Sequence, residues 1–299
     1  MEDVVSELLP GSQEVAFVDL PVAAEAAIAT VVIVAPRERM RDAADALRPS
    51  VASGGVRLIL IVAESDAAPE VRAGADGILL EGLKPEHFNN AVAALRFSSL
   101  PTLVWWRGGS PGVLTGLAAL ADRLVLDAPD PRAVWRLVPQ LAGLTAVTDV
   151  RWARLTRWRA LMAHFFDIPA VRDVADGFRS LHLRGADIHA ARLFAGWISS
   201  SLRPEGGLTM TVEEVPRAVT GAPVIQVVQL GNGRARLTLR LAESGTCVVS
   251  AVERDGGGDT SQIVSLGDQG LAAVIAEELR IRSRDLTFER SISAIGEGR

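Results

Sequence analysis

The sequence predicts an α/β protein of two domains. Residues 1–146 are expected to form an open, mainly parallel sheet with helices on both faces, and residues 147–299 an α+β domain with an antiparallel sheet. Up to residue 146, unbroken apolar runs alternate with helix-patterned stretches, which is typical of parallel strands covered on both sides. Beyond it, most runs alternate apolar and polar residues, as antiparallel strands do. The length of 299 residues is about two average domains.

The N-terminal half alternates predicted strands with predicted helices. Residues 30–35 form an apolar, largely β-branched run, and the helix-patterned stretch 37–47 follows directly. A helix expected over 85–97 places Phe88, Val92 and Leu95 on one face, as packing against a sheet requires. Further strands are predicted at 57–63, 77–80, 103–106 and 123–126, and further helices at 113–120 and 131–141. This order indicates a Rossmann-like domain.

The C-terminal half begins with a helix from residue 149 to 168 that ends before Pro169. Asn232-Gly233 between two alternating runs is a strong signal for a β-hairpin. The other predicted elements are strands at 180–183, 209–212, 224–230, 236–241 and 246–252, a turn at 255–258, and helices at 188–202 and 269–280.

Composition and charge exclude several classes of protein. Apolar residues make up 48% and charged residues 22%, which excludes a disordered chain. No apolar run is long enough to span a membrane, and the acidic start Met1-Glu2-Asp3 is unlike a signal peptide, so we expect a cytoplasmic protein. A net charge of −5 argues against nucleic-acid binding. Cys247 is the only cysteine, so no disulfide can form within the chain.

The loops of the predicted sheet lack the sequences that bind nucleotides. Residues 35–40 follow the first long strand without the glycines that admit a pyrophosphate, and no phosphate loop occurs. The glycine-rich loop 107–112 has two interpretations: an anion site, or a plain turn that begins a helix at Pro111. No serine elbow, metal-ligand spacing or converging carboxylates are visible. We therefore expect no catalytic residue, no metal and no cofactor.

Aromatic and arginine residues are concentrated in the helix after Asp149. Arg159 falls within its apolar arc, where a charge requires a partner. That partner is either an aspartate of the same chain, such as Asp122 or Asp127, or a carboxylate or anion from outside. The role of the pair Trp105-Trp106 at a strand end is likewise undecided between core and partner surface. Alternation along the strand points one ring to each face, so at most one of them needs to be in the core.

Three stretches resemble the OpcA family, the glucose-6-phosphate dehydrogenase assembly proteins of bacteria. The middle one, Asp149-Val-Arg-Trp-Ala-Arg-Leu-Thr-Arg-Trp-Arg159, is similar to the family's Asp-x-x-Trp-x-Arg-Leu-Thr-x-Trp-Arg helix and is the most specific. The other two are the double-tryptophan segment 100–108 and the segment 277–289, which resembles a closing helix with an Asp-x-x-Phe-Glu tail. The similarity runs from about residue 30 to about residue 290.

The resemblance implies a non-catalytic protein that binds glucose-6-phosphate dehydrogenase, promotes its active oligomer and raises its activity in the oxidative pentose phosphate pathway. Longer cyanobacterial members come under thioredoxin control through cysteines, which the single Cys247 does not match. The alternative function is a sugar-phosphate enzyme or sensor, with Arg107, Gly108 and Gly109 holding the phosphate.

The predicted partner surface combines the double tryptophan with the first turns of the aromatic helix. Tryptophan and arginine carry much of the binding energy at protein interfaces. Arg154 and Arg157 lie outside the apolar arc and are expected to face solvent or another chain. The partner-binding candidates are Trp105, Trp106, Arg107, Trp152, Arg154, Arg157 and Arg159.

Overall fold

The computed structural model describes residues 13–14, 27–74, 77–204, 207–215, 224–255, 257 and 259–297. Most of the first thirty residues, and two glycines of the predicted turn at 255–258, lie outside this part. The chain forms two compact units: Met1–Val150 with Leu271–Asp285, and Arg151–Gly270 with Leu286–Arg299. Residues 271–285 were expected in the C-terminal domain, and they belong instead to the first unit.

The first unit is built on an eight-stranded sheet with the strand order β1-β4-β5-β3-β2-β6-β7-β8. The six strands from β5 to β8 in this order are parallel, which confirms the predicted mainly parallel sheet. Two strands were missed at one edge, where β4 runs antiparallel to β5 and β1 antiparallel to β4. The bounds are β1 (Gln13–Glu14), β2 (Ala29–Pro36), β3 (Val56–Ala63), β4 (Glu70–Gly74), β5 (Gly77–Glu81), β6 (Thr102–Trp106), β7 (Arg123–Leu126) and β8 (Ala146–Asp149).

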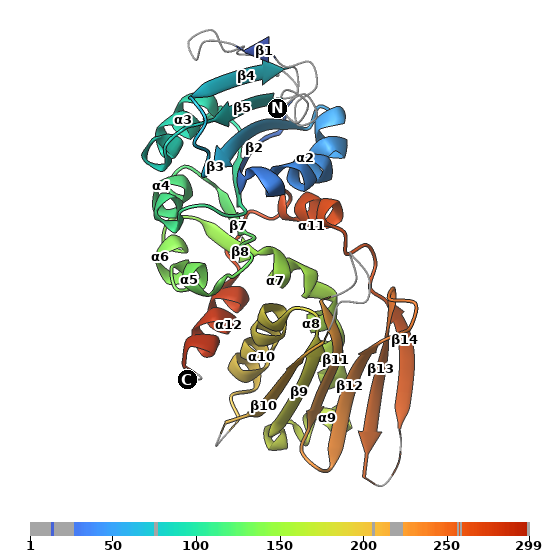
Figure 1. Ribbon diagram of the computed structural model, residues 1–299. Helices are drawn as coiled ribbons and strands as arrows, with labels where there is room; N and C mark the ends of the chain where they lie inside the picture. The colour runs from blue at the N-terminus through green and yellow to red at the C-terminus, as the bar shows by residue number, and fades with distance from the viewer. Residues whose placement is uncertain are drawn as a thin grey trace. The chain divides into compact units, whose positions relative to one another are not determined.

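Helices cover both faces of this sheet, as predicted. Figure 1 shows α2 (Arg37–Ala52) and α11 (Leu271–Glu278) on one face, and α3 (Phe88–Leu95), α4 (Leu114–Ala118) and α6 (Val138–Leu141) on the other. The predicted helix 131–141 is divided into α5 (Arg132–Trp135) and α6, and Pro139 lies in the first turn of α6. Short 3-10 turns, η2 (Pro85–His87) and η3 (Pro111–Val113), precede α3 and α4.

The second unit contains a six-stranded sheet with the order β10-β9-β11-β12-β13-β14. Its pairings are antiparallel except that β10 runs parallel to β9, so the predicted antiparallel sheet is mixed. The edge strand β14 was missed because its sequence, TSQIVS, is mainly polar. The bounds are β9 (Ser180–Gly185), β10 (Thr209–Glu214), β11 (Ile225–Gly231), β12 (Ala235–Leu241), β13 (Cys247–Arg254) and β14 (Thr260–Ser265).

Helices pack on one face of this sheet, with α10 (Ile188–Leu202) against β9 and β10 and α8 (Thr156–His164) against β12. Asp187 caps α10 by accepting hydrogen bonds from the backbone N–H groups of His189 and Ala190. A further helix, α12 (Leu286–Glu297), was not predicted and lies against α10 (Figure 1). Gly196 permits this contact, because a Cβ there would lie 2.5 Å from the carbonyl oxygen of Ser291.

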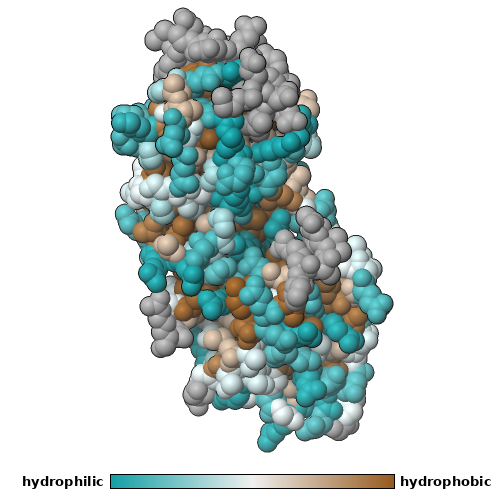
Figure 2. Space-filling model, viewed as in Figure 1, coloured by the Kyte–Doolittle hydropathy of each residue, from teal (hydrophilic) through white to brown (hydrophobic). Residues whose placement is uncertain are grey.

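The aromatic helix predicted from residue 149 to 168 is not continuous. It divides into α7 (Val150–Arg154), α8 and the 3-10 turn η4 (Phe165–Asp167), with α9 (Pro169–Arg172) and the turn η5 (Ala175–Gly177) after it. None of the helices in the described part of the chain combines the length and apolar character that crossing a membrane requires. The visible surface in Figure 2 interleaves hydrophilic and hydrophobic residues.

Candidate functional site

The first candidate site is the carboxyl end of the parallel sheet between β2 and β6. The parallel strands have the order of a Rossmann fold, in which the first and fourth strands lie side by side at the centre. Ligands of open α/β sheets bind at this switch point, outside the carboxyl ends of the strands. Here β2 ends at Pro36 and α2 begins at Arg37, so no glycine loop intervenes.

Arg107, which follows β6, occupies the switch point with its side chain 4% exposed. Its Nε donates to Asp127 Oδ2 at 2.8 Å, its Nη2 to Asp42 Oδ2 at 3.0 Å, and its Nη1 to the carbonyl oxygen of Arg39 at 2.6 Å. The guanidinium also lies over the ring of Trp105, 4.8 Å from its centroid. Burial opposes the charge, and Asp42 and Asp127 more than offset it, so the pKa of Arg107 is raised. Arg107 is therefore engaged by its own chain.

Two arginines of α2 extend this network. Arg39 Nη1 donates to the carbonyl oxygen of Asp127 at 2.7 Å and also to that of Arg107, and its Nη2 lies 3.2 Å from Asp127 Oδ2. Burial lowers the pKa of the Arg39 guanidinium, with Asp127 acting in the opposite direction. Arg37 pairs with Glu81 at the end of β5. The carboxyl ends of these strands thus hold the chain's own ion pairs.

The two glycines after Arg107 serve packing. Gly109 has φ of 94°, and a Cβ there would lie 2.8 Å from the Cβ of Ala63 at the end of β3. A Cβ on Gly108 would lie 3.0 Å from Cδ of Pro36 at the end of β2. The loop therefore lies against the ends of β2 and β3. The interpretation of Arg107, Gly108 and Gly109 as a phosphate grip loses its charged member, because the Arg107 guanidinium is hydrogen-bonded within the protein.

The double-tryptophan and aromatic-helix segments build the cores of the two units. Trp105 and Trp106 are buried in β6, and Trp152 is buried in the second unit. Trp152 packs against Phe288 of α12 with ring centroids 5.7 Å apart, so the segments 149–159 and 277–289 meet there. In the first unit, Asp149 Oδ2 accepts a hydrogen bond from Nε1 of Trp135 at 2.9 Å. The aromatic residues in the segments that resemble OpcA motifs therefore pack in the cores of the two units.

The guanidinium of Arg159 stacks on Trp152, 3.6 Å from the ring centroid, and its Nη2 donates to Thr156 Oγ1 at 3.2 Å. Both aspartates suggested as partners are engaged elsewhere. Asp127 pairs with Arg39 and Arg107, and Asp122 accepts from the N–H of Thr102 at 2.8 Å. The contact with the Trp152 ring is a cation–π interaction that the sequence did not predict.

The predicted partner surface therefore loses most of its members. Trp105, Trp106, Arg107 and Trp152 are all buried, which removes them from any docking surface. Of the remaining candidates, Arg154 and Arg159 are half-buried and Arg157 is exposed on α8. Tryptophans beside arginines do not by themselves indicate an interface, because they occur both at interfaces and in cores where arginine stacks on the ring.

The third family-like segment contributes a buried ion pair. Arg123 on β7 and Glu278 at the end of α11 pair with both side chains 5% exposed, and Arg123 Nε donates to Glu278 Oε2 at 2.6 Å. Burial raises the pKa of the Glu278 carboxyl, and Arg123 acts against this. This pair fixes α11 to the sheet of the first unit.

The structure offers a second candidate site, the face of the six-stranded sheet opposite α8 and α10, which we call the outer face. Residues alternate along each strand, so Leu181 and Leu183 are buried while His182 between them projects outward. Register aligns the outward residues into rows across the strands. One row is Glu213, Arg184, Val227, Arg240, Val249 and Ile263, and the next is Thr211, His182, Gln229, Thr238, Ala251 and Ser261.

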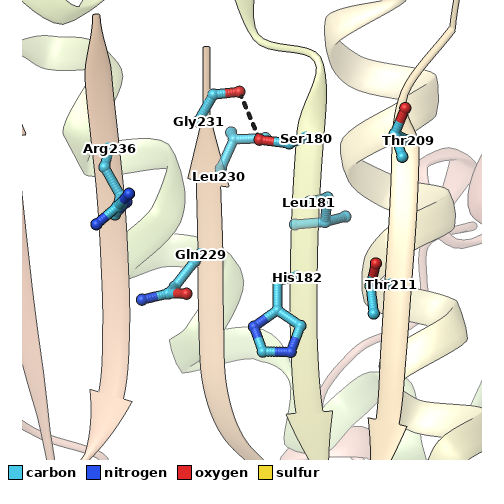
Figure 3. A pocket seen from close by; sticks show the side chains of 9 residues that line it. All are labelled: Ser180, Leu181, His182, Thr209, Thr211, Gln229, Leu230, Gly231 and Arg236. Atoms are coloured by element: carbon cyan, nitrogen blue, oxygen red, sulfur yellow. Dashed lines mark hydrogen bonds between the residues drawn. The ribbon is translucent and has the colours of Figure 1, made fainter. Parts of the chain in front are cut away.

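A hollow of about 350 Å3 lies at one end of the outer face. Figure 3 shows His182, Gln229 and Arg236 around it, with the helices on the far side of the sheet. The hollow exists because the residues at its end are small: Gly231 has no side chain, and Ser180 turns its Oγ to the Gly231 carbonyl at 3.0 Å. Its lining of hydroxyl, amide and cationic groups suits polar contacts.

Titratable groups in the described residues form ion pairs rather than a metal centre. His182 Nε2 lies 3.7 Å from Glu213, and His164 Nδ1 lies 3.0 Å from Asp167. No group of three His, Cys, Asp or Glu side chains among those described is placed to hold a metal ion.

Comparison with known proteins gives one family and several distant structural similarities, two of which are given below. Residues 145–292 match the family model that describes the C-terminal domain of a glucose-6-phosphate dehydrogenase subunit. No curated protein matches the chain. An oxidoreductase from Sinorhizobium meliloti is similar in structure at 7% identity, over 90% of this chain and 95% of that chain, with a TM-score of 0.47. A levoglucosan dehydrogenase, in complex with NADH and levoglucosan, is similar at 10% identity, over 89% and 88%, with a TM-score of 0.42.

Proposed function

From the premise that residues 145–292 place this chain in the OpcA family, we propose that it is a non-catalytic assembly factor and allosteric activator of glucose-6-phosphate dehydrogenase. It binds the dehydrogenase in the cytoplasm and promotes its active oligomer in the oxidative pentose phosphate pathway. It uses no cofactor and contacts neither nucleic acid nor membrane.

The observation that supports a binding role most strongly is the occupied switch point. In a nucleotide-dependent enzyme with this strand order, the pyrophosphate lies at the helix N-terminus after the first strand. In this chain Arg39 and Arg107 bind Asp42, Asp127 and backbone carbonyls at that place. A dinucleotide would have to displace both a buried arginine and the loop that lies against Pro36 and Ala63.

A non-catalytic activator acts only through differential affinity. It must bind the active oligomer of the dehydrogenase more tightly than the inactive form, and each tenfold shift of the equilibrium requires about 1.4 kcal/mol of that difference. The second unit, most of which lies within the matched region, offers an open sheet face for such binding.

Sedimentation velocity tests this function. The dehydrogenase of the source organism, at a concentration where it is partly dissociated, is expected to shift to a larger species that contains the chain. With serum albumin in place of the chain, the distribution should not change. An unchanged distribution with the chain, at micromolar concentrations of both proteins, would contradict an assembly role.

A further inference from the structure

We propose that the outer face of the six-stranded sheet is the surface that docks onto the dehydrogenase, with Arg240 meeting a carboxylate of that enzyme. This inference rests on the proposed function and adds the location and chemistry of the contact.

Arg240 on β12 lies between Val227 and Val249, its direct neighbours on β11 and β13. Ile263 on β14 continues the row and is 72% exposed. The row therefore joins an exposed arginine to apolar side chains on a face that α8 and α10 leave open. Protein interfaces concentrate binding energy in arginine anchors surrounded by apolar contacts that exclude water.

The charges of the outer face favour a different protein over a second copy of this chain. Its two acidic side chains are already paired, Glu213 with Arg184 at 3.1 Å and Glu253 with Arg236 at 3.4 Å. Arg240 makes no ion pair or side-chain hydrogen bond with any residue that the structure describes. Two such faces would bring surplus arginines together, so the complementary surface is one that supplies a carboxylate.

The hollow gives the face a second point of recognition. Arg236 lines it and is separated from Arg240 by one outward residue, Thr238, along β12. Because hydroxyl and amide groups line the rest, a polar side chain that protrudes from the dehydrogenase would find hydrogen-bond partners there. The carboxylate contact and the polar protrusion together define one orientation of the partner.

Titration of the dehydrogenase with charge-reversed chains tests the proposal. Arg240→Glu is expected to weaken binding at least tenfold, because it opposes the partner's carboxylate with a like charge. Arg192→Glu on α10, an exposed arginine in the helix layer, is the matched control and should bind like the wild type. Binding of the wild type should weaken from low to high salt more than binding of Arg240→Glu.

Two further variants complete the test. Ile263→Lys, at a highly exposed position, should also weaken binding, and it replaces Arg240→Glu if thermal melting shows that variant to be unfolded. Arg157→Glu tests the exposed surface of α8. Loss of binding in Arg157→Glu with wild-type affinity in Arg240→Glu would overturn the docking surface while leaving the proposed function intact. Absence of binding by the wild type would overturn both.

Discussion

Replacing Glu278 with alanine is expected to lower the free energy of unfolding by about 3–5 kcal/mol. The change leaves the guanidinium of Arg123 buried without its carboxylate, and both side chains are only 5% exposed. It also removes the ion pair that links α11 to β7. Urea denaturation of the wild type and Glu278→Ala measures the difference, and a loss below about 1 kcal/mol, the value of an exposed pair, would contradict it.

The same site has a defined pH dependence. Burial raises the folded pKa of Glu278 above its ordinary value of 4.5, so the folded chain keeps the proton to higher pH than the unfolded chain. The stability that this raised pKa contributes is therefore fully present below the unfolded pKa of Glu278. It is lost as pH rises through the folded pKa and the carboxyl ionises. Relative to Glu278→Gln, whose side chain does not titrate, the wild type should lose stability over that range.

Replacing Arg107 with alanine is expected to lower the free energy of unfolding by about 3 kcal/mol. The substitution removes the hydrogen bonds to Asp127, Asp42 and the Arg39 carbonyl, and the stacking on Trp105. The cost stays near the lower end for a buried pair, because Asp42 is 60% exposed and Asp127 keeps Arg39 at 3.2 Å. Thermal melting and urea denaturation measure it.

The matched control for Arg107 is Arg132→Ala. Arg132 pairs with Asp130 at the surface, with the two side chains 65% and 53% exposed, so its removal should leave the free energy of unfolding nearly unchanged. Below its melting temperature, Arg107→Ala should still bind the dehydrogenase. A stable Arg107→Ala chain that no longer bound the dehydrogenase would mean that Arg107 belongs to a binding site rather than to the fold.

The sequence was sufficient for the elements whose pattern is strong over their whole length. β2 and β3 are almost entirely apolar, and α10 was predicted at its observed bounds, 188–202, where the pattern changes before Pro204. The elements it missed have weaker signals: β4 carries two charged residues in five, and α12 follows a stretch rich in arginine. Assignment of α11 to the first unit depends on its packing against α2 and on its ion pair with Arg123, both of which lie far away in sequence.

The candidate site was harder to predict than the fold. Burial of Trp105 and Trp152 could not be separated from exposure, because arginine accompanies tryptophan in both settings. The outer face went unnoticed because its residues are the polar half of ordinary alternating strands. Only the register, which places Val227, Arg240, Val249 and Ile263 in one row, turns them into a surface.

The most direct test of the central claim is the initial rate of NADPH formation from glucose 6-phosphate at a fixed concentration of dehydrogenase, measured while the chain is titrated in. If the chain is a non-catalytic activator, the rate should rise and then saturate at a fixed ratio of chain to dehydrogenase protomer. The chain alone should produce no NADPH. A rate that does not respond to the chain, or one that grows without limit in proportion to it as added catalyst would, contradicts the account.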